Sequence, residues 1–147
     1  MVRIAEIKDM RNVYKLICEL EQQRLPYAQF ISIYKDQLEN PWYFCFVAEI
    51  NGEIVGILNL RIENQLRHVQ KVAEITEFVV KDGFRSLGIG KRLFKMAFEL
   101  AKENYCVQLE SSCHKNWNDV HHFYDKAGME ETSYKFIKSI SYTALNL

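Results

Sequence analysis

The sequence has no excess of charge of either sign, because nineteen lysine and arginine residues are matched by nineteen aspartate and glutamate residues. Nucleic-acid-binding proteins usually carry a clear basic excess, so this balance argues against a nucleic-acid partner. No apolar run approaches the roughly 20 residues that a membrane-spanning helix needs. The N-terminal residues Met1–Glu6 also lack the apolar stretch of a signal peptide. We therefore expect no membrane partner and a cytoplasmic protein.

Closely spaced cysteine pairs are also missing. None of the four cysteines forms a C-x-x-C pair, so we interpret them as small buried apolar residues rather than a disulfide framework or a zinc site. Only two prolines interrupt the chain, and no repeat or low-complexity linker divides its 147 residues. A hydrophobic content of 48% is typical of folded globular proteins. This length predicts a single domain over residues 1–147.

What the sequence does contain is alternating strand and helix periodicity. Strands are predicted at Val2–Ile7, Trp42–Ile50, Glu53–Leu60, Val72–Val80, Cys106–Ser112 and Thr132–Ile140. Helices are predicted from Asp9 to Leu20, from Phe30 to Leu38, from Gly88 to Asn104 and from Asn116 to Ala127. Asn51-Gly52 predicts a tight hairpin turn, because both turn positions need positive φ. The order β-α-α-β-β-β-α-β-α-β predicts an α+β (mixed α/β) fold with a mixed sheet and helices on both faces.

The segment Phe78–Lys91 has the features of an anion-binding site. A strand leads into a short loop with Arg85, and Gly88 and Gly90 then open a helix. The first turn of a helix presents unpaired N–H groups and a partial positive charge, which together favour a bound phosphate. Glycine allows close backbone approach, and Arg85 and Lys91 add full positive charge. Two glycines at a helix start are more often plain loop chemistry, and neither a Walker loop nor a Rossmann fingerprint is present.

Three segments together resemble the GNAT superfamily of N-acetyltransferases. Arg85–Gly90 is similar to its pyrophosphate loop, Glu77–Val80 to its central strand and His122–Met129 to its FYxKxGF segment. The resemblance covers nearly the whole chain in the family's order. It implies a GNAT-like sheet that splays near residues 77–80 and 106–112, admits the pantetheine arm, and uses acetyl-coenzyme A as co-substrate. The candidate residues for binding it are Phe78, Val79, Val80, Arg85, Ser86, Leu87, Gly88, Ile89, Gly90, Lys91, Asn116 and Asn118.

Within the superfamily, three further segments resemble the bacterial aminoalkylphosphonate N-acetyltransferases. These are Val13–Leu20, Leu66–Val69 and Ala73–Val80. The sequence departs from that subfamily where it has Tyr27, Gln65 and Arg67 in place of histidine, and Trp117 stands where relatives often have arginine. Acetyl transfer is therefore implied more firmly than a phosphonate substrate or a divalent metal.

The chemistry of acetyl transfer to an amine requires a base, because only about one alkylammonium in a thousand is neutral at pH 7. Glu74 and Glu77 are the candidates, and either can equally be an ordinary solvated strand residue. Because the two residues are three apart, a regular strand would point their side chains to opposite faces of the sheet, whereas a β-bulge between them would shift this alternation by one residue. We favour Glu77 slightly. Backbone N–H groups of residues 78–80 are candidates for stabilising the oxyanion.

The leaving thiolate needs a proton, and Tyr124 matches the family's general-acid tyrosine. Asn116 and Asn118 are candidates for contacting the pantetheine arm, although asparagine before a helix is more often an N-cap. His121 and His122 point to different sides of their helix, and without a supporting carboxylate they predict no metal site.

Basic residues also gather before the central strand. The set consists of Arg61, Arg67, His68 and Lys71. These residues are candidates for binding an anionic tail of the substrate, but we favour their interpretation as an ordinary charged sheet edge. The expected acceptor is therefore a primary amine of a small molecule, with an aminoalkylphosphonate as one option. The alternatives are a protein or peptide N-acetyltransferase and a non-catalytic acyl-coenzyme A sensor. A homodimer is one option for the assembly.

Overall fold

The computed structural model describes residues 1–142 and divides the chain into two compact units, one from Met1 to Ser111 and one from Ser112 onward. In the first unit the elements are β1 (Val2–Ile4), a short 3-10 turn (Ile7–Asp9), α1 (Met10–Glu21), α2 (Tyr27–Glu39), β2 (Tyr43–Ile50), β3 (Glu53–Gln65), β4 (Gln70–Val80), α3 (Ile89–Glu103) and β5 (Leu109–Ser111). The second unit holds α4 (Asn118–Lys126). The single domain over residues 1–147 stays a prediction.

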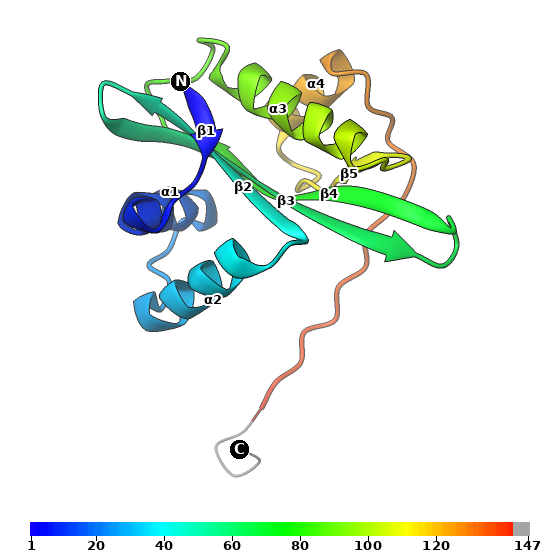
Figure 1. Ribbon diagram of the computed structural model, residues 1–147, viewed down its shortest axis with the longest axis horizontal. Coiled ribbons are helices and arrows are strands. Elements are labelled where there is room, and N and C mark those ends of the chain that lie inside the picture. Colours follow the sequence, from blue (N-terminus) through cyan, green and yellow to red (C-terminus); the bar gives the residue numbers. More distant parts are fainter. Residues whose placement is uncertain (143–147) are drawn as a thin grey trace. The chain divides into compact units, whose positions relative to one another are not determined.

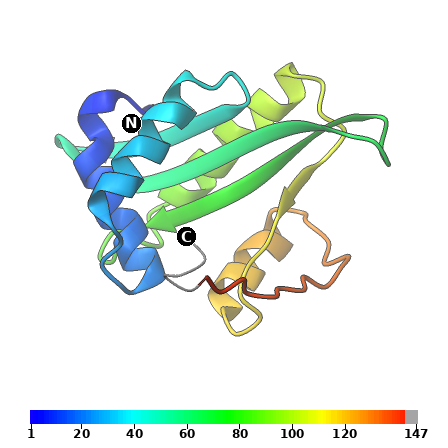
Figure 2. The same cartoon turned by 90° about the horizontal axis from the view of Figure 1, so that it is seen from below.

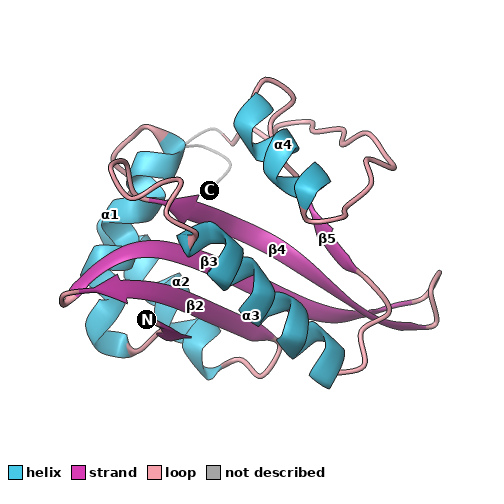
Figure 3. Cartoon of the chain, turned by 90° about the horizontal axis from the view of Figure 1, so that it is seen from above, coloured by secondary structure: helices cyan, strands magenta, loops and turns pink. Residues whose placement is uncertain are grey.

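The first unit is a five-stranded sheet in the order β1-β2-β3-β4-β5. The first four strands are antiparallel to their neighbours, and β5 runs parallel to β4. Helices α1 and α2 cover one face of this sheet and α3 covers the other, as Figures 1 and 3 show. The predicted mixed sheet with helices on both faces is therefore confirmed.

Local sequence explains the central hairpin. Asn51 and Gly52 both have positive φ, at 49° and 81°, so the predicted tight turn joins β2 to β3. Strand β3 then continues five residues beyond the predicted end at Leu60, and β4 begins two residues before Val72. The sequence missed these extensions because polar and charged side chains replace the apolar alternation there.

The packing of α3 against the sheet depends on a glycine within β3. A Cβ added to Gly56 would lie 3.1 Å from Leu93 Cδ1 and 3.3 Å from Ile89 Cγ2. Both partners belong to α3, and Ile89 is its first residue. Gly56 therefore allows the N-terminal half of α3 to lie directly on the strand.

On the opposite face, α1 and α2 pack on the sheet through a second apolar layer. Val13 and Leu16 of α1 are 2% and 3% exposed and lie in one cluster with Val47 of β2 and Ile57 of β3. Figure 2 shows both helices lying along this face of the sheet. The layer matters for function because it bounds the pocket described below.

The second unit confirms one predicted helix and corrects one predicted strand. Helix α4 ends at Lys126, and Gly128, with φ of 85°, is the predicted C′ residue. The strand predicted at Thr132–Ile140 is wrong, because residues 129–142 lie in neither helix nor strand. Alternating apolar residues give a segment strand propensity, but a strand also needs a partner, and none in the described part of the chain pairs with it. No helix within residues 1–142 is long and apolar enough to cross a membrane.

Candidate active site

A β-bulge places the two candidate bases on the same face of the sheet. Asn59 of β3 pairs with Glu77, whereas the next residue, Leu60, pairs with Ile75, so Thr76 is the extra residue of β4. Further along, Arg61 pairs with Glu74. Because Asn59 and Arg61 are two apart and share a face, their partners Glu77 and Glu74 share it too. The bulge thus removes the opposite orientation that a regular strand would impose.

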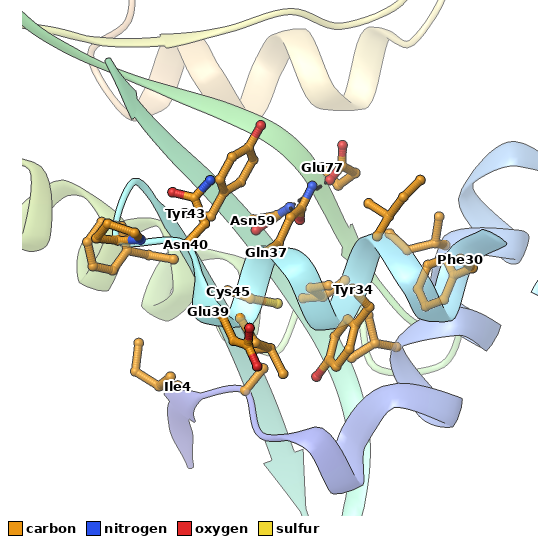
Figure 4. A pocket seen from close by; sticks show the side chains of 18 of the residues that line it. Ile4, Phe30, Tyr34, Gln37, Glu39, Asn40, Tyr43, Cys45, Asn59 and Glu77 are labelled. Carbon is orange, nitrogen blue, oxygen red and sulfur yellow. Dashed lines mark hydrogen bonds between the residues drawn. The ribbon is translucent and has the colours of Figure 1, made fainter. Parts of the chain in front are cut away.

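Glu77 belongs to a polar cluster beneath α2. Asn59 Nδ2 donates to Glu77 Oε1 and to Gln37 Oε1, at 2.9 Å each. Thr76 Oγ1 donates to the same Glu77 oxygen at 3.1 Å. Asn59 is only 5% exposed, and its Oδ1 is shielded from solvent without a hydrogen-bond partner. Figure 4 shows Gln37, Asn59 and Glu77 meeting between α2 and the sheet.

Glu74, by contrast, is committed to an ion pair. Arg61 Nη2 lies 2.7 Å from Glu74 Oε1, and Glu63 lies 4.0 Å from the same guanidinium nitrogen. The Glu74 carboxylate is therefore engaged by a cation, whereas Glu77 accepts hydrogen bonds from the neutral side chains of Asn59 and Thr76.

A pocket of about 850 Å³ is lined mainly by α1, α2 and the strands β2, β3 and β4, together with Leu100 of α3, and Glu77 is among its lining residues. Its volume is within the range common for small-molecule sites. Glu74 does not line it. The pocket is largely apolar, with the Gln37–Asn59–Glu77 cluster as part of its polar wall (Figure 4).

The pocket is also lined by a thiol, Cys45, which is a candidate nucleophile. Burial, and then the negative charge of Glu77, raise the pKa of the Cys45 thiol to about 12. The thiol therefore stays protonated near neutral pH, and a protonated thiol is a poor nucleophile. This favours direct transfer to the acceptor over a covalent enzyme intermediate.

Strand pairing opens beside Glu77. The pairing between β4 and β5 ends at Ile75–Ser111, and within residues 1–142 no strand pairs with this edge of β4 beyond that point. Lys81 N donates to Val55 O of β3. Because successive N–H groups of a strand point to alternate edges, the amides of Phe78 and Val80 point to the open edge. Pairing with β5 therefore ends two residues before Glu77, and the splay expected near residues 77–80 and 106–112 stays a prediction.

The loop after β4 leads into the N-terminus of α3 as the sequence predicts. Gly88 is the N-cap residue with φ of 83°, no side chain caps the helix, and Arg92 N donates to Gly88 O. A Cβ at Gly88 would meet nothing within 4 Å, so no described residue beyond its chain neighbours crowds that side of Gly88. Ser86, Leu87 and Gly88 are exposed, and Ser86 has a positive φ of 64°. Open amides at a helix N-terminus fit a diphosphate.

The two basic residues predicted to bind the anion, Arg85 and Lys91, differ in their surroundings. Arg85 Nη1 lies 2.9 Å from Asp82 Oδ1, and Arg85 Nε donates to Val80 O at 2.9 Å. The two contacts fix the guanidinium over the loop, and Asp82 offsets part of its charge. Lys91, in the first turn of α3, is exposed, whereas Ile89 is buried and Gly90 half-buried. A phosphate at this helix end would therefore be held by the backbone N–H groups of the first turn of α3, the proposed anion cradle, more than by Arg85.

The remaining predicted residues lie in the second unit, so we describe their local setting alone. Tyr124 lies within α4, and its carbonyl accepts from Met129 N at 3.0 Å. Trp117 is the N-cap residue of α4, and no side chain caps the helix. Neither Asn116 nor Asn118 therefore has the capping role that asparagine commonly takes.

His114 and His121 of the second unit have local contacts. Asn116 N donates to His114 Nδ1 at 3.2 Å, and His121 Nε2 lies 3.3 Å from His114 O. No group of three or more histidine, cysteine, aspartate or glutamate residues in the described range is arranged to hold a metal ion.

The predicted basic residues of β3, of the turn after it and of the start of β4 do not line the pocket. Arg61 is paired with Glu74, Arg67 Nη2 lies 3.9 Å from Glu110 Oε2, and Lys71 Nζ lies 5.8 Å from the centre of the Trp42 ring. This arrangement agrees with the interpretation as a charged sheet edge.

Sequence reasoning missed Gln37, Asn59 and the pocket they line. One signal was available: Asn59 stands inside the apolar run Ile57-Leu58-Asn59-Leu60, and a polar residue in such a run is an informative exception. Gln37 had no comparable signal, because polar residues on one face of a helix are ordinary.

Comparison with known proteins identifies the family. The acetyltransferase (GNAT) family model matches residues 7–129. An aminoalkylphosphonate N-acetyltransferase from Salmonella typhimurium is 32% identical over 139 residues, covering 95% of this chain and 90% of that protein. A candidate ribosomal protein bS18-alanine N-acetyltransferase from Bacillus subtilis is 29% identical, covering 88% and 80%.

A solved structure supports the same fold. The structure of an aminoglycoside acetyltransferase from an uncultured soil metagenomic sample, in complex with trehalose, matches with a TM-score of 0.83 at 18% identity, covering 96% of both chains. The chain belongs to the acetyltransferase (GNAT) family, and it is an N-acetyltransferase that uses acetyl-coenzyme A as acetyl donor.

Proposed function

We propose that this GNAT enzyme acetylates the primary amine of a small molecule bound in the pocket lined mainly by helices α1 and α2 and the strands of the sheet. The observation that carries the proposal is the position of Glu77, which lines the pocket and lies on β4 directly after its pairing with β5 has ended. An amine in the pocket is thereby next to the strand edge that suits an extended acyl arm. A volume of about 850 Å³ suits a small molecule.

In the proposed mechanism Glu77 accepts a proton from the bound ammonium, directly or through water. The hydrogen bonds from Asn59 and Thr76 hold one carboxylate oxygen in place and leave the other to face the amine. The neutral amine then attacks the thioester carbonyl and forms the C–N bond of a tetrahedral intermediate. As this intermediate collapses, the C–S bond breaks, the departing thiolate takes up a proton, and the nitrogen releases its second proton to solvent. Positioned bases of this kind contribute about 10²–10⁴-fold to a rate.

The acetyl donor would be held by backbone groups. The first turn of α3 and the loop of residues 85–88 would bind its diphosphate, with Lys91 adding positive charge. The amides of Phe78 and Val80 point to the open edge of β4, and donors at such an edge suit the oxygen that becomes negative in the transition state.

Tyr124 is the proposed general acid. Its place in the His122–Met129 segment matches the family motif, and a phenol with a usual pKa near 10 can protonate a departing thiolate. Asn116 and Asn118 are proposed contacts of the pantetheine arm.

The acceptor has two candidate classes. The similarity to an aminoalkylphosphonate N-acetyltransferase supports a small amine. The similarity to a candidate bS18-alanine N-acetyltransferase supports a protein N-terminus as the second candidate.

A thiol-release assay with acetyl-coenzyme A tests the proposal. Alkylamines, aminoalkylphosphonates, polyamines, aminoglycosides and alanine-terminated peptides would be compared at equal concentrations. We expect kcat/KM to be highest for a small amine. Turnover with peptides alone would exclude the small-molecule acceptor.

A further inference from the structure

Among the described residues that line the pocket, every charged side chain is acidic. Glu21, Glu39 and Glu77 line it, whereas none of its lining residues in the described chain is lysine, arginine or histidine. We infer that the acceptor is an amine whose remaining part is apolar and has no anionic group, so that aminoalkylphosphonates are disfavoured. This inference rests on the proposed function and specifies its substrate class.

The polar cluster favours hydrogen-bond donors. Glu77 presents a carboxylate at the pocket wall. The Asn59 amide nitrogen is already used, because it donates to both Gln37 and Glu77. An ammonium or amine supplies N–H donors, whereas a phosphonate offers mainly acceptor oxygens and negative charge. The cluster thus matches the reactive end of an amine and repels an anion.

The helical walls of the pocket are apolar along their length. Phe30, Ile33 and Leu38 of α2 line it at spacings of three and five residues, and Val13 and Ile17 of α1 face it at a spacing of four. These walls can remove the hydrocarbon part of an amine from water, at about 25 cal/mol for each Å² buried. An anionic tail in the same place would lose its hydration without gaining a partner.

The basic residues of the sheet edge have partners of their own. Arg61 is held by Glu74 at 2.7 Å, Arg67 lies 3.9 Å from Glu110, and Lys71 lies over the Trp42 ring. None of the three lines the pocket, so none of them neutralises the charge of a phosphonate bound there.

A matched pair of acceptors tests the inference. Butylamine and 3-aminopropylphosphonate share a primary amine followed by three methylene groups, and the chain then ends in a methyl group in the first and in a phosphonate anion in the second. With the wild-type enzyme and saturating acetyl-coenzyme A, we expect kcat/KM for butylamine to exceed that for aminopropylphosphonate by roughly tenfold or more. A higher kcat/KM for the phosphonate would overturn the inference.

A positive charge introduced by substitution at the pocket rim tests where the part of the acceptor beyond its amine lies. Ile33 is 58% exposed and lines the pocket, so Ile33→Lys adds a cation without opening the core. Ile33→Lys should lower the butylamine-to-phosphonate ratio by roughly fivefold or more, whereas Ile33→Gln, which is polar and neutral, should not favour the phosphonate. An unchanged ratio in Ile33→Lys would contradict placement of the tail along α2.

Failure of the inference differs from failure of the proposed function. If the phosphonate is the better substrate, acetylation of a small amine stands and only the tail chemistry is wrong. If no small amine releases thiol while calorimetry still shows coenzyme A binding, the proposed function fails and the inference fails with it.

Discussion

Glu77→Gln is the substitution that tests the proposed base most directly. Glutamine keeps the shape of the side chain, and its Oε1 can still accept from Asn59 Nδ2 and Thr76 Oγ1, which now lie 2.9 and 3.1 Å from the glutamate oxygen. The fold and the cradle at α3 should therefore be preserved. What is lost is the ability to accept a proton.

The expected loss of kcat/KM follows from the rate enhancement that a general base provides. A factor of about 10²–10⁴ in kcat/KM corresponds to roughly 3–5 kcal/mol of transition-state stabilisation. The deficit should shrink with rising pH, because the neutral fraction of a free alkylamine grows about tenfold for each pH unit below its pKa near 10.4. The variant would then depend on amine that is already neutral in solution.

The assay is steady-state thiol release with butylamine between pH 7 and 10, with coenzyme A binding measured by calorimetry. Glu74→Gln is the matched control, since Glu74 lies on the same face but is paired with Arg61. We expect Glu74→Gln to retain kcat/KM within about threefold. A loss of less than threefold in Glu77→Gln, or a larger loss in Glu74→Gln, would refute the assignment of the base.

Three further substitutions test other parts of the site and the fold. Gly88→Glu should weaken coenzyme A binding in calorimetry by roughly tenfold or more relative to Gly88→Ala. Both variants share the strain of a positive φ, and only Gly88→Glu adds a carboxylate to the cradle. Equal affinities of the two variants would place the diphosphate elsewhere. Tyr124→Phe should lower kcat by roughly 10²-fold with little change in KM, and an unchanged kcat would remove Tyr124 from the mechanism. Asp9→Asn should lower the free energy of unfolding by about 3 kcal/mol in urea titration, because it breaks the buried pair with Arg3, whose two nitrogens lie 2.8 and 2.9 Å from the carboxylate. The hydrogen bonds from Arg3 lower the pKa of the Asp9 carboxyl. The pair therefore contributes fully to the free energy of unfolding above the ordinary aspartate pKa near 3.9, and this contribution is lost as pH falls through the lower pKa of the folded state. The same dependence of unfolding on acid pH in wild type and Asp9→Asn would contradict this.

Much of the fold is encoded locally and was predictable. The Asn51-Gly52 turn, the apolar stripes of α1 and α3 and the glycine at the start of α3 each depend on neighbours within a few residues. Elements of this kind follow from backbone sterics and periodicity alone. The predicted strand at Thr132–Ile140 failed because pairing is decided by distant residues, which periodicity does not show.

The site was less predictable, since its polar cluster joins three separate elements. Gln37 belongs to α2, Asn59 to β3 and Glu77 to β4, and only the sheet register brings them within hydrogen-bond distance. The choice between Glu74 and Glu77 likewise depended on Arg61, a partner 13 residues away in sequence. Motif reasoning found the phosphate loop because that site is contiguous, and it missed the pocket because the pocket is not.

The bulge at Thr76 links these observations into one mechanism. A strand without the extra residue would turn either Glu74 or Glu77 to the α3 face, away from the pocket. With it, Arg61 engages Glu74 while Glu77 remains beside Asn59 at the pocket wall. Pairing with β5 ends at Ile75, one residue before the bulge, so the open strand edge begins where the proposed base lies. One unpaired residue therefore accounts both for the choice of base and for its nearness to the edge that would hold the acyl arm.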